Sequence, residues 1–341
     1  MKNSLQNREY LIKRHRLSHR QIDNLLGENR SKEFINTSIQ SLEFIKHFIE
    51  LIDILNEHNI SYISFKGPLL SQQIYGDPTV RFSHDIDILV DKNCMNEINK
   101  VLLDAGYSYI GDTIWPDNKN QIKILMDSIQ HLGYLHSQHG LMVEIHWTLS
   151  ITLPVTLPIL QKVISWNKNE EFFYGRKIMT FSPEFNLLYL IIHGSKHGWQ
   201  RLKWLVDIKD YPYDKIDQQK FEELIKIFHA QRIVSQTYVI LMHYLNYNQP
   251  MLFKTKVPNR ILKYVYAFMD NPINENQGIK DSISFLMYKL LLFKNTYYKF
   301  SVFTDMMISS HDAFKIKSSY KIVYFIYRPY SYIKRRVYNA T

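Results

Sequence analysis

Three carboxylates in the first half of the chain have the residue types and spacing of a metal-binding site. Asp85 and Asp87 alternate with isoleucine in residues 85–90 (Asp-Ile-Asp-Ile-Leu-Val), which predicts a strand with both acids on one face. Carboxylates two residues apart on a strand lie ~6–7 Å apart, close enough to share hard divalent cations. Glu144 belongs to a second predicted strand, residues 141–149, and points to its polar side. Together the three acids predict a two-metal site for phosphoryl transfer.

A Lys-Gly turn upstream has the features of a phosphate-binding loop. Lys66 and Gly67 separate a predicted strand, residues 60–65, from a predicted helix. Backbone N–H groups at the start of that helix, together with the helix dipole, form a cradle for phosphate. Lys66 and Arg81 are candidates to balance the charge of a triphosphate, and Lys196 is a further candidate on a later helix.

The acidic pair also has a purely structural explanation. An Asp-x-Asp pair can lie on the solvated face of an antiparallel sheet, but the company of Gly67, Arg81 and Glu144 favours metal binding. We expect His146 to hydrogen-bond a ligand or to pack in the core, because magnesium prefers oxygen ligands. The sequence therefore predicts a site of carboxylates without a histidine ligand.

The region after residue 193 leaves two alternatives open. Lys196, Arg201 and Asp207 are either a solvated helix face with an ion pair or part of the far wall of a nucleotide cleft. In the second case Lys196 would lie near phosphates, and Trp199 or Trp204 near the base. Sequence patterns alone favour neither alternative.

Two other reactive groups are expected to be structural. His193 and His197 are four residues apart on a predicted helix, which suits zinc, but no metalloprotease-type Glu follows and no Cys is near. A structural zinc there is not favoured. Cys94, the single cysteine, has no His or Asn arrangement around it, so we expect a packed or inert thiol.

The elements that must position these residues form a small core of strands between helices. Periodicity predicts helices over 31–59 and 93–105, and two strands, 131–137 and 141–149, separated by a hairpin-like Gln-His-Gly loop. After Pro158 the pattern changes to helices, which we expect at 183–197, 201–211, 218–245, 260–270, 279–298 and 320–337. The fold class is therefore predicted to be α+β: a small mixed β-sheet core, an N-terminal helix and a larger C-terminal helical region.

These motifs resemble the nucleotidyltransferase superfamily that includes DNA polymerase beta and the aminoglycoside nucleotidyltransferases. The resemblance is carried by Phe65-Lys66-Gly67, Tyr75-Gly76-Asp77, Arg81, His84 to Val90, Val143 to Trp147 and the helical stretch 193–210. The sequence is most similar to the uncharacterised bacterial branch with a Lys-Gly turn and an Asp-Ile-Asp strand. Two departures concern the phosphate cradle: Pro68 after Gly67 removes one N–H donor, and 17 residues separate Gly67 from Asp85.

The resemblance implies a metal-dependent enzyme that moves an NMP from an NTP such as ATP to an acceptor hydroxyl, releasing pyrophosphate. Asp85, Asp87 and Glu144 would be the catalytic residues and the ligands of Mg²⁺ or Mn²⁺, and Gly67 would hold the triphosphate. Glu144 would bind the metal that lowers the pKa of the acceptor, or act as base. We expect the acceptor to be a small molecule or a peptide or protein; nucleic acid is less favoured, because no RNA-binding module is recognisable.

Four segments are expected along the chain: an N-terminal helical segment (1–59), the nucleotidyltransferase core (60–150), a helical domain closing the cleft (151–250) and a C-terminal helical region (251–341). The last contains a basic tail, because residues 313–341 hold seven Lys or Arg and no acid. An alternative function is therefore a non-catalytic interaction protein that binds a partner, nucleic acid or an anionic membrane surface through this tail. The oligomeric state stays open.

Composition places the chain among ordinary globular proteins. It has 341 residues, 45% of them hydrophobic and 22% charged, and a formal net charge of +10. A single cysteine excludes an intramolecular disulfide framework and favours a reducing compartment. The polar, basic N-terminus lacks the apolar run of a signal peptide, and no stretch is long enough to span a membrane. We therefore expect a cytoplasmic protein.

Overall fold

The computed structural model describes residues 7–27, 33–110, 115–116, 118–248, 255–271, 279–307, 312, 316, 318 and 320–338. The chain divides into two compact units. Unit 1 consists of Met1–Phe48, Phe65–Ser83 and Pro154–Thr296, and unit 2 of Ile49–Ser64, His84–Leu153 and Tyr297–Thr341. The chain thus passes between units just before Lys66 and again just before Asp85.

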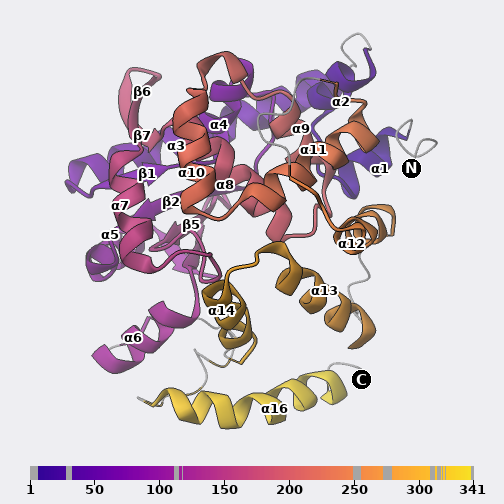
Figure 1. Ribbon diagram of the computed structural model, residues 1–341. Coiled ribbons are helices and arrows are strands. Elements are labelled where there is room, and N and C mark those ends of the chain that lie inside the picture. Colours follow the sequence, from indigo (N-terminus) through magenta and orange to yellow (C-terminus); the bar gives the residue numbers. More distant parts are fainter. Residues whose placement is uncertain are drawn as a thin grey trace. The chain divides into compact units, whose positions relative to one another are not determined.

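Unit 2 contains a five-stranded mixed sheet (Figure 1). Its strands, in spatial order, are β1 (Tyr62–Ser64), β2 (Asp85–Val90), β5 (Met142–His146), β4 (His131–His136) and β3 (Tyr107–Tyr109). Strands β2 and β5 are parallel, and the other neighbouring pairs are antiparallel. The predicted α+β fold class with a small mixed sheet is confirmed.

Alternating side chains give this sheet one apolar face. The side chains of Ile86 and Ile88 on β2, and of Val143 and Ile145 on β5, are each 0% exposed, so the isoleucines that alternate with the acids anchor β2 in the core. Burial of such side chains stabilises the fold by ~1.5–3 kcal/mol each. A one-residue slip in strand register would turn them to the opposite face and bury the acids in their place. The apolar face therefore fixes the direction in which the acids point.

Helices and a 3-10 turn complete unit 2. After β2 the chain forms the 3-10 turn η1 (Lys92–Cys94) and then helix α5 (Met95–Asp104), where one continuous helix was predicted. Helix α6 (Lys119–Ser128) precedes β4, and helices α14 (Thr296–Met307) and α16 (Lys321–Tyr338) form most of the C-terminal part. Tyr324 of α16 is 1% exposed and packs on Ile124 of α6. Most residues of the basic tail that precede or follow α16, including 339–341, lie outside the described part of the chain.

Unit 1 is built from helices and one β-hairpin. Its elements are α1 (Arg8–Lys13), α2 (His19–Leu26), the first part of α3 (Glu33–Glu57), α4 (Gly67–Tyr75), α7 (Leu157–Trp166), β6 (Lys168–Phe173), β7 (Arg176–Phe181), α8 (Pro183–Lys196), α9 (Leu202–Lys209), η2 (Tyr213–Lys215), α10 (Gln218–Ile227), α11 (Gln231–Leu245), α12 (Asn259–Asp270) and α13 (Ile279–Leu292). Helix α8 is buried along most of its length, as expected for a central helix.

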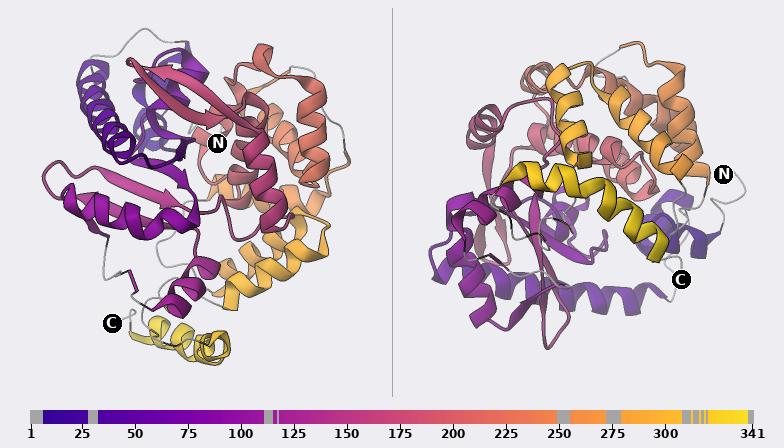
Figure 2. Two further views of the ribbon diagram at one scale, coloured as in Figure 1. Left: turned by 90° about the vertical axis from the view of Figure 1, so that its left-hand side faces the viewer. Right: turned by 90° about the horizontal axis from the view of Figure 1, so that it is seen from below.

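The structure differs from the sequence prediction at three places in the C-terminal half. Residues 168–181 form the β6–β7 hairpin, where only helices were expected after Pro158 (Figure 2, left). The helix predicted over 218–245 is two helices, since His229 between them has a φ of +48°. The helix predicted over 279–298 also divides, into α13 and the beginning of α14.

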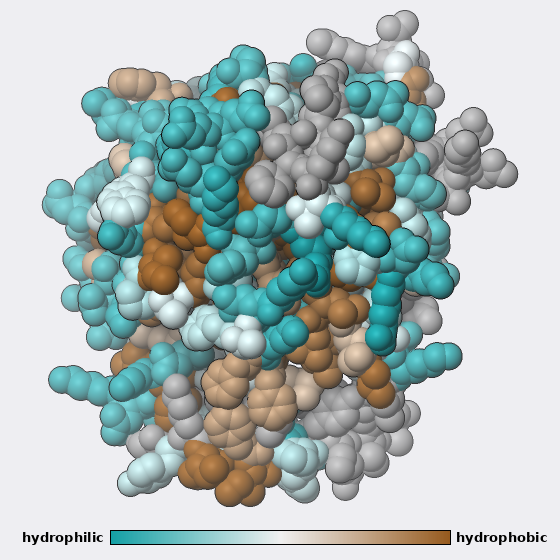
Figure 3. All heavy atoms as spheres, in the orientation of Figure 1, coloured by the Kyte–Doolittle hydropathy of each residue, from teal (hydrophilic) through white to brown (hydrophobic). Residues whose placement is uncertain are grey.

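The described surface is mixed in character. In the space-filling view, hydrophobic side chains gather at the bottom, over α14 and α16 (Figure 3). Exposed members of this group are Phe300 and Phe303 of α14 and Ile322 and Ile326 of α16. No helix among the described residues combines the length and the apolar character needed to cross a membrane.

Candidate active site

The three predicted carboxylates lie on one face of the sheet in unit 2. In the parallel register of β2 and β5, Asp85 pairs with Met142 and Asp87 pairs with Glu144. Paired residues on neighbouring strands point to the same side, so Asp85, Asp87 and Glu144 share the face opposite the buried isoleucines. The strand containing Glu144 is therefore next to the Asp-Ile-Asp strand, as the sequence predicted.

An imidazole joins two of the acids. The Nε2 atom of His146 lies 3.0 Å from Oδ1 of Asp87 and 3.3 Å from Oε2 of Glu144. The two carboxylate oxygens cannot be farther apart than the sum of these distances, which is within reach of a shared pair of ions. His146 thus contacts the ligand candidates, in agreement with its expected role as a hydrogen-bonding neighbour.

A second histidine completes this group. His131 of β4 is directly opposite His146 in the antiparallel β4–β5 register, and its Nε2 lies 3.6 Å from Oε2 of Glu144. Sequence analysis did not single out His131. Pairing the predicted strands across the three-residue Gln-His-Gly loop would place residue 131 against residue 147; the observed register, with Leu135 opposite Met142, places it against His146 instead.

Burial and neighbouring imidazoles set the charge of Glu144. Burial opposes its ionisation, but the hydrogen bond with His146 and the charge of His131 outweigh that cost, so its pKa lies below its usual range. Asp87 is 1% exposed, whereas the Glu144 side chain is 24% exposed. Glu144 is therefore an ionised carboxylate with access to solvent.

The Lys-Gly turn lies in unit 1, at the beginning of α4. Lys66 is the N-cap residue, and Gly67 has a φ of +70°, a conformation that glycine adopts without strain. The ammonium group of Lys66 lies 5.7 Å from the ring centroid of Tyr189 on α8. The start of this helix therefore carries a cation, at the end where the N–H groups of a helix lack partners within the helix itself.

Three predicted phosphate ligands influence the ionisation of one partly buried histidine, His193. Burial lowers the pKa of His193 well below its usual value, and the charges of Lys66, Lys196 and Arg81 lower it further. His197 shows the same direction of shift, with Lys196 and Lys66 contributing, although part of its surface is exposed. Lys66, Lys196 and Arg81 all belong to unit 1 and all favour the neutral form of His193; we call these three residues the cationic cluster.

Arg81 and Asp207 form a buried ion pair. The Nε atom of Arg81 donates to Oδ2 of Asp207 at 2.8 Å, and its Nη1 donates to the Ser83 hydroxyl at 2.9 Å. Asp207 is 0% exposed, so the suggestion that it belongs to a solvated helix face is wrong. Arg81 has a structural partner in this state, and its phosphate-binding role stays a prediction.

The two tryptophans of this region have different surroundings. Trp199 is 0% exposed and packs on Gly194 of α8, so the suggested contact between Trp199 and a base is wrong. Trp204 is partly exposed, and its ring lies 5.5 Å from that of His193 and 5.2 Å from that of His197. Trp204 remains a candidate to stack on a base.

Other titratable groups agree with structural roles. Burial, with the charges of Asp91 and Glu97, raises the pKa of the Cys94 thiol, which opposes nucleophilic use. Among the described residues, His193 and His197 belong to neither group of three side chains arranged to hold a metal ion. One such group is His131, Glu144 and His146.

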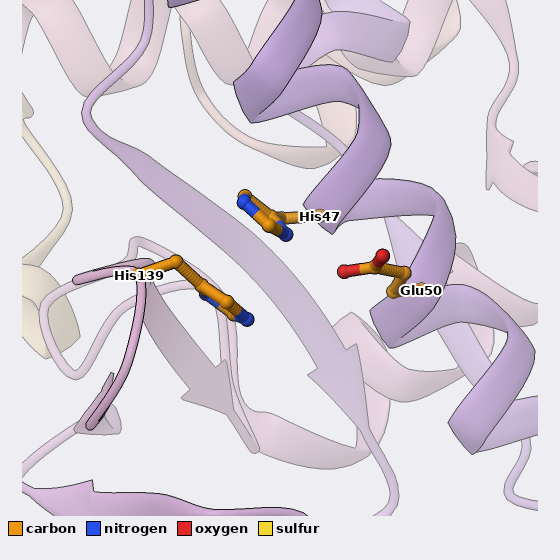
Figure 4. A group of neighbouring side chains, drawn as sticks. All are labelled: His47, Glu50 and His139. Atoms are coloured by element: carbon orange, nitrogen blue, oxygen red, sulfur yellow. The ribbon is translucent and has the colours of Figure 1, made fainter.

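The other such group includes Glu50 of α3 and His139, which precedes β5. Their ligand atoms lie within 4.8 Å of each other in unit 2, and His47 lies one helical turn before Glu50 on α3 (Figure 4). His139 also stacks on His136, with ring centroids 3.5 Å apart. Nothing in the sequence analysis singled out this group.

The mixed sheet carries an Asp-x-Asp strand beside a strand with a third acid, the arrangement that the resemblance to nucleotidyltransferases implies. The chain belongs to the family described as uncharacterised nucleotidyltransferases, which matches residues 13–246. The resemblance noted in the sequence is thereby confirmed, and the protein is a nucleotidyltransferase. No curated protein matches the sequence.

Three solved structures are similar to the chain at low identity. Lincomycin-bound lincosamide antibiotic adenylyltransferase LnuA is 19% identical, with a TM-score of 0.29, covering 42% of this chain and 83% of the other. Antibiotic-resistance factor ANT(2'')-Ia is 11% identical, with a TM-score of 0.38, covering 61% and 100%. An antigenic nucleotidyltransferase-like protein from Paracoccidioides brasiliensis is 15% identical, with a TM-score of 0.30, covering 63% and 92%.

Proposed function

We propose that this nucleotidyltransferase transfers an NMP from an NTP, in the presence of Mg²⁺ or Mn²⁺, to a hydroxyl of a small molecule or a polypeptide. The observation that carries the proposal is the shared face of β2 and β5, where Asp87 pairs with Glu144 in the parallel register. In the reaction the acceptor oxygen bonds to the α-phosphorus, the bond to the β-phosphate oxygen breaks, and pyrophosphate leaves while the hydroxyl proton is lost.

The carboxylate face suits hard divalent cations. Asp85, Asp87 and Glu144 supply oxygen ligands, the donor type that Mg²⁺ and Mn²⁺ prefer. When bound, such ions supply charge neutralisation and lower the pKa of the acceptor hydroxyl. Glu144 and Asp85 are partly exposed whereas Asp87 is buried, and Glu144 comes from the neighbouring strand, so we assign it the role of meeting the acceptor or taking its proton.

The cationic cluster is proposed to hold the triphosphate. Lys66 caps α4, and Lys196 lies at the end of α8, so both offer ammonium groups in the same unit as the Gly67 turn. The neutral form of His193, which both lysines favour, adds a hydrogen-bonding group without a charge of its own. Trp204 is proposed to stack on the base.

The tail-based alternative has weaker support. Helix α16 exposes Ile322 and Ile326, but the same helix buries Tyr324 against Ile124 and so belongs to the packing of unit 2. Binding of a partner through this helix gives no reason for the three acids to converge on one face of the sheet. Nucleotidyl transfer accounts for the convergence of the acids, and the packing of α16 needs no separate function.

Mass spectrometry of a cell extract tests the proposal. The extract is incubated with the protein, Mg²⁺ or Mn²⁺ and each NTP in turn, and products are scored for the addition of one nucleotide. We expect such products with the wild type and not with Asp85→Asn, whereas Asp91→Asn, an exposed acid just beyond β2, should match the wild type. Products that carry only a phosphoryl group, or none, would contradict nucleotidyl transfer.

A further inference from the structure

Two imidazoles and a carboxylate meet at the edge of the acidic face in unit 2. His131 and His146 are directly opposite each other on β4 and β5, with ring centroids 4.7 Å apart. Both Nε2 atoms approach the same oxygen, Oε2 of Glu144, at 3.6 and 3.3 Å. Three potential ligand atoms from two neighbouring strands therefore converge without any change of backbone.

The separations match the ligand shell of a tetrahedral ion. Zinc binds imidazole nitrogen and carboxylate oxygen at ~2.0–2.2 Å, so two of its ligands in a tetrahedral site are about 3.4 Å apart. The distances from Glu144 to the two imidazoles bracket that value. The side chains of His131 and Glu144 are 32% and 24% exposed, so an ion has a path from solvent.

The donor set is different from that of a magnesium site. Magnesium prefers oxygen ligands in octahedral geometry, whereas imidazole suits zinc, cobalt and related ions. We propose that His131, Glu144 and His146 bind a divalent transition-metal ion of the zinc class. Binding of this ion does not depend on nucleotide transfer. Its consequence for catalysis, that Glu144 next to Asp87 would be occupied by the ion, rests on the proposed function.

Cobalt absorption provides a direct test, because Co²⁺ held by imidazole in a low-coordinate site absorbs visible light. The parent protein for all measurements carries His139→Gln, which removes a ligand of the other histidine-containing group. The test variant adds His131→Gln to this parent. The matched control adds His58→Gln instead, since His58 is an exposed histidine of the same unit outside both groups. No NTP is present.

We expect the parent and the control to develop the Co²⁺ absorption and to lose it when one equivalent of Zn²⁺ is added. His131→Gln should weaken Co²⁺ binding by at least about 100-fold, because loss of a direct ligand costs more than loss of an outer partner. Equal Co²⁺ affinity in the test and control variants would overturn the proposal.

X-ray absorption of the Zn²⁺-loaded parent provides a second readout that needs no folding-sensitive variant. Two imidazole neighbours at the zinc are expected, and a shell of oxygen alone would overturn the proposal. These readouts stay informative if nucleotide transfer is absent. Conversely, transfer that depends on Asp85 would survive a failure of zinc binding, so the two proposals fail separately.

Discussion

At the scale of single residues, charge is concentrated at two separate places in the chain. Glu144 and Asp87 share the imidazole of His146 in unit 2, whereas Lys66 and Lys196 shift the pKa of His193 in unit 1. Metal ions need negatively charged ligands, and a triphosphate needs positively charged ones. The two groups can therefore be tested separately, by metal binding and by nucleotide affinity.

We predict that Lys66→Ala and Lys196→Ala each raise the KM for NTP about 10- to 100-fold while changing metal affinity little. A hydrogen bond to a charged group is worth about 1.5–3 kcal/mol, and these ammonium groups are proposed to meet phosphate oxygens. Steady-state kinetics and Mg²⁺ titration measure the two effects. Lys162→Ala, an exposed lysine on α7, is the control. Unchanged KM in both test variants would place the triphosphate elsewhere.

The acids of the site could be identified from sequence because alternation with buried isoleucines determines their face. Asp85 and Asp87 are two residues apart, so no long-range information was needed. The position of His131 depends on the register between two strands, and the predicted three-residue loop would have paired residue 131 with residue 147 instead of His146. The sequence left Trp199 and Trp204 as alternatives for the base because nothing local shows that Trp199 is buried and Trp204 partly exposed.

At the scale of elements, the Arg81–Asp207 pair connects the segment after α4 to helix α9. We predict that Asp207→Ala lowers the free energy of unfolding by about 3–5 kcal/mol, because it leaves a buried guanidinium without its counter-charge. Urea unfolding measures the change.

Asp210→Ala provides the comparison on the same helix end. Asp210 pairs with Lys209, with both side chains partly exposed, and accepts a long hydrogen bond from the Tyr75 hydroxyl at 3.4 Å, so its loss should cost clearly less than that of Asp207. Equal costs for Asp207→Ala and Asp210→Ala would show that burial does not strengthen the inner pair.

Helix α8 also depends on a glycine. A Cβ at Gly194 would lie 2.3 Å from the ring of Trp199, so Gly194→Ala is predicted to destabilise the protein by about 1–3 kcal/mol through overpacking. Ser195→Ala is the matched neighbour: Ser195 is buried and its hydroxyl has no hydrogen-bond partner, so its loss should be nearly neutral. Thermal unfolding compares the two. A Gly194→Ala variant as stable as Ser195→Ala would contradict the packing.

Sequence patterns predicted elements well where periodicity was strong and less well where tertiary contacts decide. Strand β2 and helix α8 were placed within one residue, since each has a clear apolar repeat and Ser182-Pro183 begins the helix. The β6–β7 hairpin was not predicted because Lys168–Phe173 contains four polar or charged residues and has no strong strand pattern. The Arg81–Asp207 pair joins residues 126 positions apart, beyond any local pattern.

At the scale of the whole molecule, buried neutral histidines make stability depend on pH. His15, which is 0% exposed, accepts a hydrogen bond from the backbone N–H of Leu202, and burial lowers its pKa to about 4. Between about pH 4 and 6.5 the unfolded chain therefore binds a proton that the folded chain does not. Stability should fall as the pH drops through this window.

We predict that His15 accounts for on the order of 3 kcal/mol of this acid destabilisation, given its pKa shift from 6.5 to about 4. His15→Asn should reduce the difference in unfolding free energy between about pH 7 and about pH 4.5, although His193 and His197 still contribute. Urea unfolding at the two pH values measures it. An equally large difference in the variant would assign the effect to other groups.

The α+β class and the family followed from residues in the middle of the chain, which contain the motifs. The match to the family covers residues 13–246, and the domain limits expected at 59, 150 and 250 stay predictions. Compact units built from three chain segments each could not be derived from local patterns. Their segments alternate along the sequence, and only long-range packing groups them.

Transfer of label from NTP tests the central claim most directly. Reactions contain Mg²⁺, an acceptor found in the extract screen and NTP labelled at either the α- or the γ-phosphate, with wild type, Asp87→Asn and the control Asp91→Asn. We predict that the wild type and Asp91→Asn move the α-label to the acceptor and release the γ-label in pyrophosphate. Asp87→Asn should remain folded and be about 100-fold slower or more, because a lost metal ligand costs several kcal/mol of transition-state stabilisation. Transfer of the γ-label, or an unchanged rate in Asp87→Asn, would contradict the account.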